Sequence, residues 1–360
     1  MKKLSKIAMF VLLCVMLVCF VLAACDTDNN TNGKVPDIRN DHFAPVMVSL
    51  GEWLYWEPCI GAVSYDIYRG ENKIANVTDT RYFVGEHSND TYYSAVANYK
   101  GGSSDHSTPT LVSKNVGYTD DEILDLSNFN GEAVTVTSKT RKVVVKYSEQ
   151  KELYTSFIIE TRTTDIVFEL TNATLVGLGQ YGVISTPNGQ YDRASNNFSI
   201  VFDVEGECGV KGLQPATPSK PAKNSGSAGD NGANGVKAVL ASSVVVVGSG
   251  TMTFIGGKGQ NGAPGADSDM LSSASYGHGG NGGNGGGALV CKYLLLDMQE
   301  NGTLSLVNGM GGENGGRGIG ATLTDMSHLS HTAAQCDGSD GSVGKSYIQI
   351  SVVIGGTLNK

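Results

Sequence analysis

Three carboxylates alternate along one strand-like segment in the middle of the chain. Asp203, Glu205 and Glu207 occupy every second position between Val201 and Gly209. Because successive side chains of a β-strand point to opposite faces, this spacing predicts three carboxylates on one face, at steps of about 6 to 7 Å. Such a row could bind calcium through its oxygens or supply an acid and a base to a glycosidic bond. A solvated strand face is the alternative.

Other residue types that bind metals gather near the C-terminus. This cluster comprises Asp325, His328, His331 and Cys336. Its spacing matches no zinc motif, so we interpret it as an exposed loop. The cysteines that follow residue 25 are far apart and form no C-x-x-C pair, which predicts isolated thiols rather than a disulfide framework: Cys59, Cys208, Cys291 and Cys336.

Two glycine-rich motifs look like parts of known active sites. Gly277-His278-Gly279 resembles the catalytic tripeptide of polygalacturonases, but the neighbouring aspartates and the Arg-x-Lys of that family are missing. The segment Gly257 to Gly262 has the G-x-G-x-x-G spacing of dinucleotide sites, yet more glycine follows it instead of a helix. We therefore expect no cofactor and no catalytic residue from either motif.

The first 25 residues indicate where the protein works. Lys2, Lys3 and Lys6 precede an apolar run, which ends in Leu22-Ala-Ala-Cys25. This layout is typical of a secretory signal and resembles the bacterial lipoprotein signal. The resemblance implies removal of residues 1–24 and acyl chains, such as palmitate, on Cys25. We thus expect a membrane-anchored protein of the bacterial cell envelope that faces outside the cytoplasm; a plain secretory signal is the alternative.

Charge and glycine content limit the remaining possibilities. The formal net charge is -9, and loss of the three signal lysines makes it -12. A chain this acidic is not expected to bind nucleic acid, and without a basic run its membrane contact would come from the acyl chains. Of the 48 glycines, 16 precede residue 226 and 32 lie from there onward, which predicts a change of architecture near residues 215–225.

Residues 25–43 are polar and contain Gly33 and Pro36, so they predict a tether. Short alternating runs over residues 44–115 predict an all-β sandwich. This segment resembles a fibronectin type III domain through Leu54-x-Trp56, Pro58, Ala62, Tyr65-x-Ile67-Tyr68-Arg69, Tyr93-x-Ala95-Val96-Ala97 and Gly101-x-Ser103. The resemblance implies a spacer or contact module without catalytic residues.

An aromatic pair in this segment is a candidate ligand-binding site. If Leu54 and Trp56 face the core, strand alternation puts Trp53 and Tyr55 on the other face. Exposed aromatic rings can stack on sugars or proteins. The same two rings could instead pack against a neighbouring loop or domain.

Residues 116–225 contain runs rich in Val, Ile and Phe, with no helical period. Runs tipped by Asn and Gly, such as Leu170 to Gly177, resemble rungs of a right-handed parallel β-helix, in which each turn stacks on the last. We expect these residues to form its N-terminal rungs.

Residues 226–360 repeat a strand pair, whose second strand begins at Gly250, Gly302 and Gly356. Glycine ladders of period three accompany the pairs, for example Gly277, Gly280, Gly283 and Gly286. Period three is that of polyproline II, so the ladders predict close-packed helices held by weak Cα–H contacts, similar to the glycine-rich bundles of certain antifreeze proteins and phage tail adhesins. Flexible loops on a β-solenoid are the alternative. In either case we expect a polar surface from Asn234, Gln260, Asn281, Asn284 and Asn314.

These observations lead to one expected function and two alternatives. The leading hypothesis is a lipid-anchored surface or adhesion protein that recognises an extracellular carbohydrate or another surface and is not an enzyme. The first alternative is a polysaccharide-active β-helix enzyme that uses the row from Asp203 to Glu207. The second is a passive structural element of the envelope.

Overall fold

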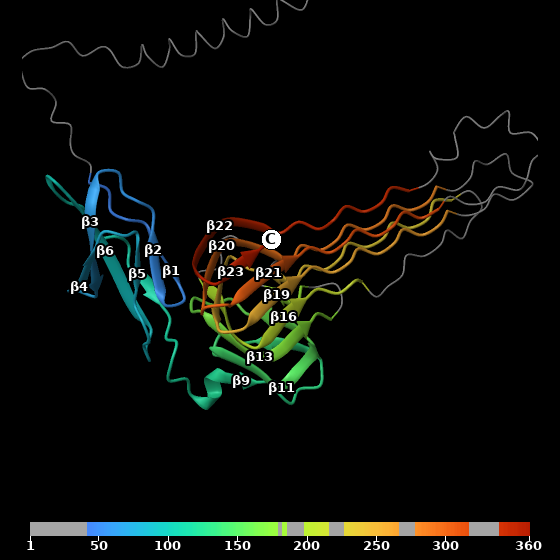
Figure 1. The fold of residues 1–360 in the computed structure, drawn as a ribbon, viewed down its shortest axis with the longest axis horizontal. Coiled ribbons are helices and arrows are strands. Elements are labelled where there is room, and N and C mark those ends of the chain that lie inside the picture. Colours follow the sequence, from blue (N-terminus) through green and yellow to red (C-terminus); the bar gives the residue numbers. More distant parts are fainter. Residues whose placement is uncertain (1–41, 179–181, 186–197, 216–226, 266–277, 317–337) are drawn as a thin grey trace, which may run out of the picture. The chain divides into compact units, whose positions relative to one another are not determined.

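The computed structural model describes residues 42–178, 182–185, 198–215, 227–265, 278–316 and 338–360 (Figure 1). The described residues are almost entirely β-structure, with one short 3-10 helix, η1 (Asp120–Glu122). The predicted lipidation site, Cys25, and the cluster from Asp325 to Cys336 lie outside these ranges. No helix in the described ranges has the length and apolar character that a membrane span requires.

The N-terminal part consists of two antiparallel sheets. The strands are β1 (Met47–Leu50), β2 (Trp53–Trp56), β3 (Ala62–Arg69), β4 (Asn72–Val77), β5 (Arg81–Phe83), β6 (Thr91–Tyr99), β7 (Gly102–Ser103) and β8 (Thr110–Val112). Sheet β1-β2-β5 packs on sheet β4-β3-β6-β7, to which β8 also pairs. Leu54 and Trp56 lie in the shared core, as predicted. The sandwich is therefore confirmed, while its fibronectin type III identity stays a prediction.

The rest of the chain coils into a solenoid of parallel strands. These are β9 (Ile123–Asp125), β10 (Ala133–Val136), β11 (Lys142–Tyr154), β12 (Ser156–Ile159), β13 (Ile166–Val176), β14 (Ile184–Ser185), β15 (Ser199–Glu205), β16 (Glu207–Lys211), β17 (Val239–Leu240), β18 (Ser243–Gly248), β19 (Thr251–Ile255), β20 (Leu289–Met298), β21 (Thr303–Val307), β22 (Tyr347–Gly355) and β23 (Thr357–Asn359). Their pairing is parallel throughout, so the predicted parallel solenoid is confirmed.

The strand pairs define three walls. Wall 1 stacks β9, the first half of β11, the first half of β13, β15, β18, the second half of β20 and β22. Wall 2 stacks the second halves of β11 and β13 with β16, β19, β21 and β23. Wall 3 stacks β10, β12, β14, β17 and the start of β20. Each turn of the chain adds strands to wall 3, wall 1 and wall 2, in that order.

The corner between walls 1 and 2 needs a left-handed backbone. Gly206 separates β15 from β16 with φ of 71°, and Asn172 bends β13 with φ of 50°. Glycine takes this conformation without steric penalty, and asparagine tolerates it better than most residues. A Cβ at position 206 would also lie 2.1 Å from Asn172 Oδ1, so this corner has no room for a side chain.

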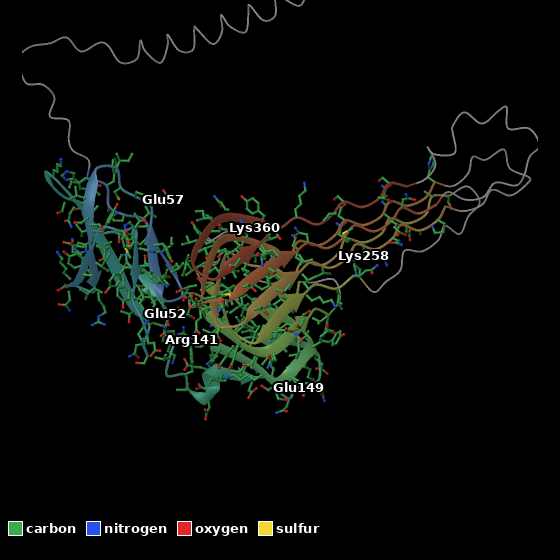
Figure 2. The ribbon with its side chains drawn as sticks, in the orientation of Figure 1. Glu52, Glu57, Arg141, Glu149, Lys258 and Lys360 are labelled. Atoms are coloured by element: carbon green, nitrogen blue, oxygen red, sulfur yellow. The ribbon has the colours of Figure 1, made fainter. Side chains whose placement is uncertain are left out.

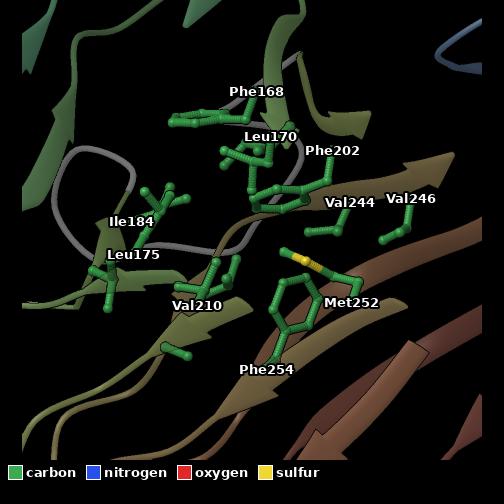
Figure 3. Packing of buried hydrophobic residues seen from close by; sticks show 14 of the residues in the cluster. Phe168, Leu170, Leu175, Ile184, Phe202, Val210, Val244, Val246, Met252 and Phe254 are labelled. Atoms are coloured by element: carbon green, nitrogen blue, oxygen red, sulfur yellow. The ribbon is translucent and has the colours of Figure 1, made fainter. Parts of the chain in front are cut away.

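Phenylalanine rings stack through the interior of the solenoid (Figure 3). The ring centroids of Phe168 and Phe202, which are in register, lie 5.6 Å apart, and those of Phe202 and Phe254 lie 5.3 Å apart. Phe157 meets Phe168 edge to face at 5.1 Å. All four rings are fully buried, so three successive turns contribute aromatic surface to one continuous core. This ladder was not predicted from the sequence.

The glycine ladders form an ordered bundle. Five described segments, here called the glycine arms, leave wall 2 or return to wall 3 beside one another: residues 228–235, 256–265, 278–287, 309–316 and 338–344 (Figure 1). The arms are joined by ordinary backbone hydrogen bonds, such as Gly283 N–H to Gln260 O at 2.7 Å and Gly312 N–H to Gly283 O at 2.7 Å. The predicted close packing is confirmed, but the expected weak Cα–H contacts are not what joins the arms.

Glycine is densest in the arm at the centre of the bundle. The central arm, residues 278–287, exchanges hydrogen bonds with all four other arms and has two glycines in each triplet. The edge arms 228–235 and 338–344 have one. At Gly283 a Cβ would lie 2.0 Å from Ala233 O, so no side chain fits between the backbones.

Side-chain amides join the outer rows of the bundle. Asn281 Oδ1 accepts from Ser339 N–H at 2.8 Å, and Asn284 Oδ1 accepts from Ser342 N–H at 2.9 Å. Asn234, Asn281, Asn284 and Asn314 are exposed, as expected. Gln260 is not, because it is only 7% exposed and its Oε1 accepts from Ala233 N–H. Its predicted place on the polar surface is therefore wrong.

Candidate functional site

The three alternating carboxylates do not form one row. Asp203 and Glu205 lie on β15 in wall 1, whereas Glu207 begins β16 in wall 2. The left-handed corner at Gly206 interrupts the strand, so the alternation predicted from Val201 to Gly209 does not continue through it. All three side chains are exposed. No group of three metal-ligating side chains converges anywhere in the described ranges, and this corner is no exception.

Asp203 instead belongs to a row that crosses the rungs of wall 1. The strand pairing aligns Glu169, Asp203, Val247 and Asp297 on successive rungs. Neighbouring rungs are about 4.8 Å apart. Aligning Val167-Phe-Glu-Leu with Val201-Phe-Asp-Val would have revealed the start of this row in the sequence.

A cleft of about 390 Å³ opens over this row. One side of it is the edge of the N-terminal sandwich, with Trp53, Phe83 and Asn115, and the other is wall 1, with Asp203 and Asp297. An apolar wall with a few convergent polar groups is typical of ligand sites in proteins. Of these residues, Phe83, Asn115 and Asp297 were not identified from the sequence.

The candidate aromatic pair faces the solenoid rather than open solvent. Trp53 and Tyr55 are half-buried and pack with the apolar residues of wall 1. Trp53 Nε1 donates to Asp297 Oδ2 at 3.0 Å, and its ring lies 4.9 Å from that of Phe83. The alternative of packing against a neighbouring domain is therefore what the structure shows. Trp53 still forms part of the cleft, and Tyr55 lines a separate apolar cavity of about 590 Å³.

Asp203 has the least satisfied carboxylate of the cleft. Among the described residues, no group hydrogen-bonds to it or forms an ion pair with it, whereas Asp297 accepts from Trp53 and Glu52 accepts from Asn115. Desolvation by the surrounding protein, together with the charge of Glu169, raises the pKa of Asp203, although the charges of Lys142 and Lys146 act in the opposite direction. A ligand group could therefore reach this carboxylate without displacing a protein partner.

In contrast to Asp203, Glu169 on the neighbouring rung has ion-pair partners. Lys142 and Lys146 both form ion pairs with its carboxylate. Burial alone would raise the pKa of Glu169, but hydrogen bonds from the two lysines outweigh it and lower that pKa. Adjacent carboxyl groups thus have pKa values displaced in opposite directions.

A smaller polar groove continues from the cleft. It has a volume of about 210 Å³ and shares Asp203, Gly248 and Gln299 with the cleft. Thr171 and Glu205 line its far side. Asp203 therefore lies where the two depressions meet.

Ion pairs fix the sandwich to the solenoid beside the cleft. Lys114 Nζ lies 2.6 Å from Glu122 Oε2, and Arg141 Nη2 lies 2.8 Å from Asp90 Oδ2. The side-chain contact with Lys114 is the main cause that lowers the pKa of Glu122 to about 2. Figure 2 shows Glu52 and Arg141 among the side chains of this region. The joint preorganises the two sides of the cleft.

The glycine motifs that resembled active sites have structural roles instead. His278 and Gly279 belong to the central arm, where the carbonyl of His278 accepts from Gly229 N–H. Gly257, Gly259 and Gly262 lie in an outgoing arm and contact other backbones. Among the described residues, no helix follows either segment.

Comparison with protein families and with curated protein sequences gives no match. Among solved structures, two crystal structures of pectate lyase Pel3 from Pectobacterium carotovorum are similar at 9% identity. They cover 78% and 73% of this chain, and 92% and 80% of their own chains, with TM-scores of 0.17 and 0.19. Such loose superpositions do not place residues in equivalent positions. The site is therefore interpreted from its own geometry.

Proposed function

We propose that this protein is a lipid-anchored surface protein that binds an extracellular glycan in the cleft between the sandwich and wall 1. The predicted signal and Cys25 support the surface location. The half-buried Trp53 ring and the carboxylates opposite it support the ligand class, because sugars present both apolar C–H faces and hydroxyl donors. The ordered glycine arms would belong to the displayed surface.

The observation that carries this proposal is the position of Asp203. Its carboxylate has no direct partner among the described residues, yet it lies at the junction of two depressions, across from an aromatic wall. Because the side chain is exposed, water or a ligand can donate to this carboxylate, and a donor bound in the cleft would form a charge-assisted hydrogen bond with it. Sugar hydroxyls are suitable donors.

A glycan-array screen of the mature chain, followed by titration of the best oligosaccharide, tests the proposal. Asp203→Asn keeps the size of the side chain and removes its charge, and we expect it to weaken binding by about tenfold or more. Glu207→Gln is the matched control, because Glu207 is exposed, directly follows Gly206 at the same corner and lines neither depression. Equal loss in both variants, or no binding at all, would contradict the assignment.

Cleavage of the glycan is a second candidate function, and one observation favours it. Glu169 and Asp203 are on adjacent rungs, and retaining glycosidases hold their two carboxyl groups about 5 Å apart. The pKa of Asp203 is raised and that of Glu169 is lowered, which is the arrangement that an acid and a nucleophile need. Chromatography of glycans after incubation tests it. Product formation that Glu169→Gln abolishes supports an enzyme, and intact glycan supports binding alone.

A further inference from the structure

The charged groups around the cleft indicate which glycans it accepts. Its lining includes Glu52, Asp165, Asp203 and Asp297 but only one base, Lys114. The ammonium of Lys114 is already paired with Glu122. A ligand in the cleft therefore meets a lining in which acidic side chains outnumber basic ones.

The polar groove extends this negative character along the solenoid. Glu169, Asp203 and Glu205 line it, and no lysine or arginine does so. The nearest bases, Lys142 and Lys146, both pair with Glu169. Glu205 accepts only a long hydrogen bond of 3.3 Å from Thr171 Oγ1 among the described contacts. The negative charge thus continues from the cleft into the groove.

The acids are also arranged along a line rather than at random. Asp203 and Asp297 face outward from the same row of wall 1, two rungs apart. Val247 separates them and lines the cleft with its side chain. An extended ligand that crosses the rungs would meet an acid, an apolar step and a second acid. A polyanionic ligand would be repelled at both ends of this line.

We infer that, within the proposed glycan-binding function, the cleft and groove select a glycan that carries free amino groups. A protonated amine can donate a charge-assisted hydrogen bond to the unpartnered Asp203 carboxylate, which is stronger than a bond from a neutral hydroxyl. The ring faces of the same sugar can contact Trp53 and Phe83. Uronic acid polymers, whose carboxylates would meet those of the protein, are excluded by the same charges.

Three oligosaccharides of equal length test this inference. They are fully deacetylated chito-oligosaccharide, its N-acetylated form and oligogalacturonate, each titrated against the mature chain by calorimetry at low salt. We expect the deacetylated form to bind about tenfold more tightly than the acetylated one. This preference should shrink as salt is raised, and oligogalacturonate should not bind.

Variants assign the preference to the cleft. Asp203→Asn should reduce the advantage of the amine-bearing form to about twofold or less, whereas Glu207→Gln should keep it. Equal binding of the acetylated and deacetylated forms, or tightest binding of oligogalacturonate, would overturn the inference but keep glycan binding. Failure of all three sugars, together with a silent glycan array, would overturn the proposed function itself.

Discussion

The solenoid and the glycine arms stack the same chain in two different ways. In the solenoid the strands are joined at their edges and the interior is filled by side chains, with Phe202 and its neighbours fully buried. In the arms the interior is backbone, and hydrogen bonds run to several neighbours from a single arm. Figure 2 shows Lys258 on the outside of the arms, where its side chain is exposed.

This difference shows that glycine allows a core to be built from backbone, because it has no side chain to keep neighbouring backbones apart. A solenoid rung is stabilised by the apolar area that it removes from water. An arm is stabilised by close backbone approach, which any Cβ would prevent, as at Gly283. The two regions should therefore respond to opposite kinds of substitution, and this contrast can be tested directly.

The largest effect should come from removing a ring of the solenoid ladder. Phe202→Ala would leave a cavity between Phe168 and Phe254, and we expect it to lower the free energy of unfolding by about 3 to 5 kcal/mol. Denaturant unfolding followed by far-UV circular dichroism measures it. Phe43→Ala, at a side chain that is 69% exposed, is the control and should change stability by less than about 0.5 kcal/mol. A loss below about 1 kcal/mol for Phe202→Ala would refute a continuous core.

Adding a single methyl group should disrupt the bundle instead. In Gly283→Ala the new Cβ would clash with Ala233 O, and we expect a loss of about 1 to 3 kcal/mol confined to the arms. Gly316→Ala is the matched control, because no atom of the described residues lies within 4 Å of its added Cβ. Amide hydrogen exchange at Gly312 and Gly341 should accelerate only in the first variant. Equal behaviour of the two variants would mean that the arms are not close-packed.

A smaller effect should follow from cutting the amide row on the outside of the bundle. Asn284→Ala removes the acceptor for Ser342 N–H, and we expect a cost of about 0.5 to 1.5 kcal/mol. Faster exchange of the Ser342 amide would report it. The exposed Lys258 provides the comparison, since Lys258→Ala on another arm should leave exchange unchanged. If both variants behave alike, the asparagine rows do not hold the arms.

The smallest expected effect is a difference in acid sensitivity. The pKa of Glu122 is lowered from 4.5 to about 2, so its contribution is present above about pH 4.5 and is lost as the pH falls toward 2. The pKa of Glu169 is also lowered. Backbone hydrogen bonds of the arms do not titrate. Hydrogen exchange at pH 5 and pH 3 should therefore show loosening around Glu122 and Glu169 before the arms, and Glu122→Gln should weaken that difference. Simultaneous loosening would contradict it.

Local periodicity predicted much of the architecture. Period two identified Leu54 and Trp56 as core residues, and period three identified the glycine arms. The cleft was harder to predict because it depends on register. Asp203 and Asp297 are 94 positions apart in the sequence but only two rungs apart in wall 1, and unequal excursions separate the rungs. The prediction that Asp203, Glu205 and Glu207 form one row was wrong for a local reason. A single left-handed glycine, Gly206, ends the alternation of the strand.

The backbone core of the arms also has an evolutionary consequence. In an edge arm such as residues 228–235, glycine occupies every third position and the intervening side chains are exposed. Asn231 and Asn234 accept hydrogen bonds from the central arm, whereas other intervening residues, such as Ala233, could be replaced without altering the scaffold. Such a bundle separates architecture from surface chemistry, which suits a molecule whose exterior must diversify while its frame stays constant.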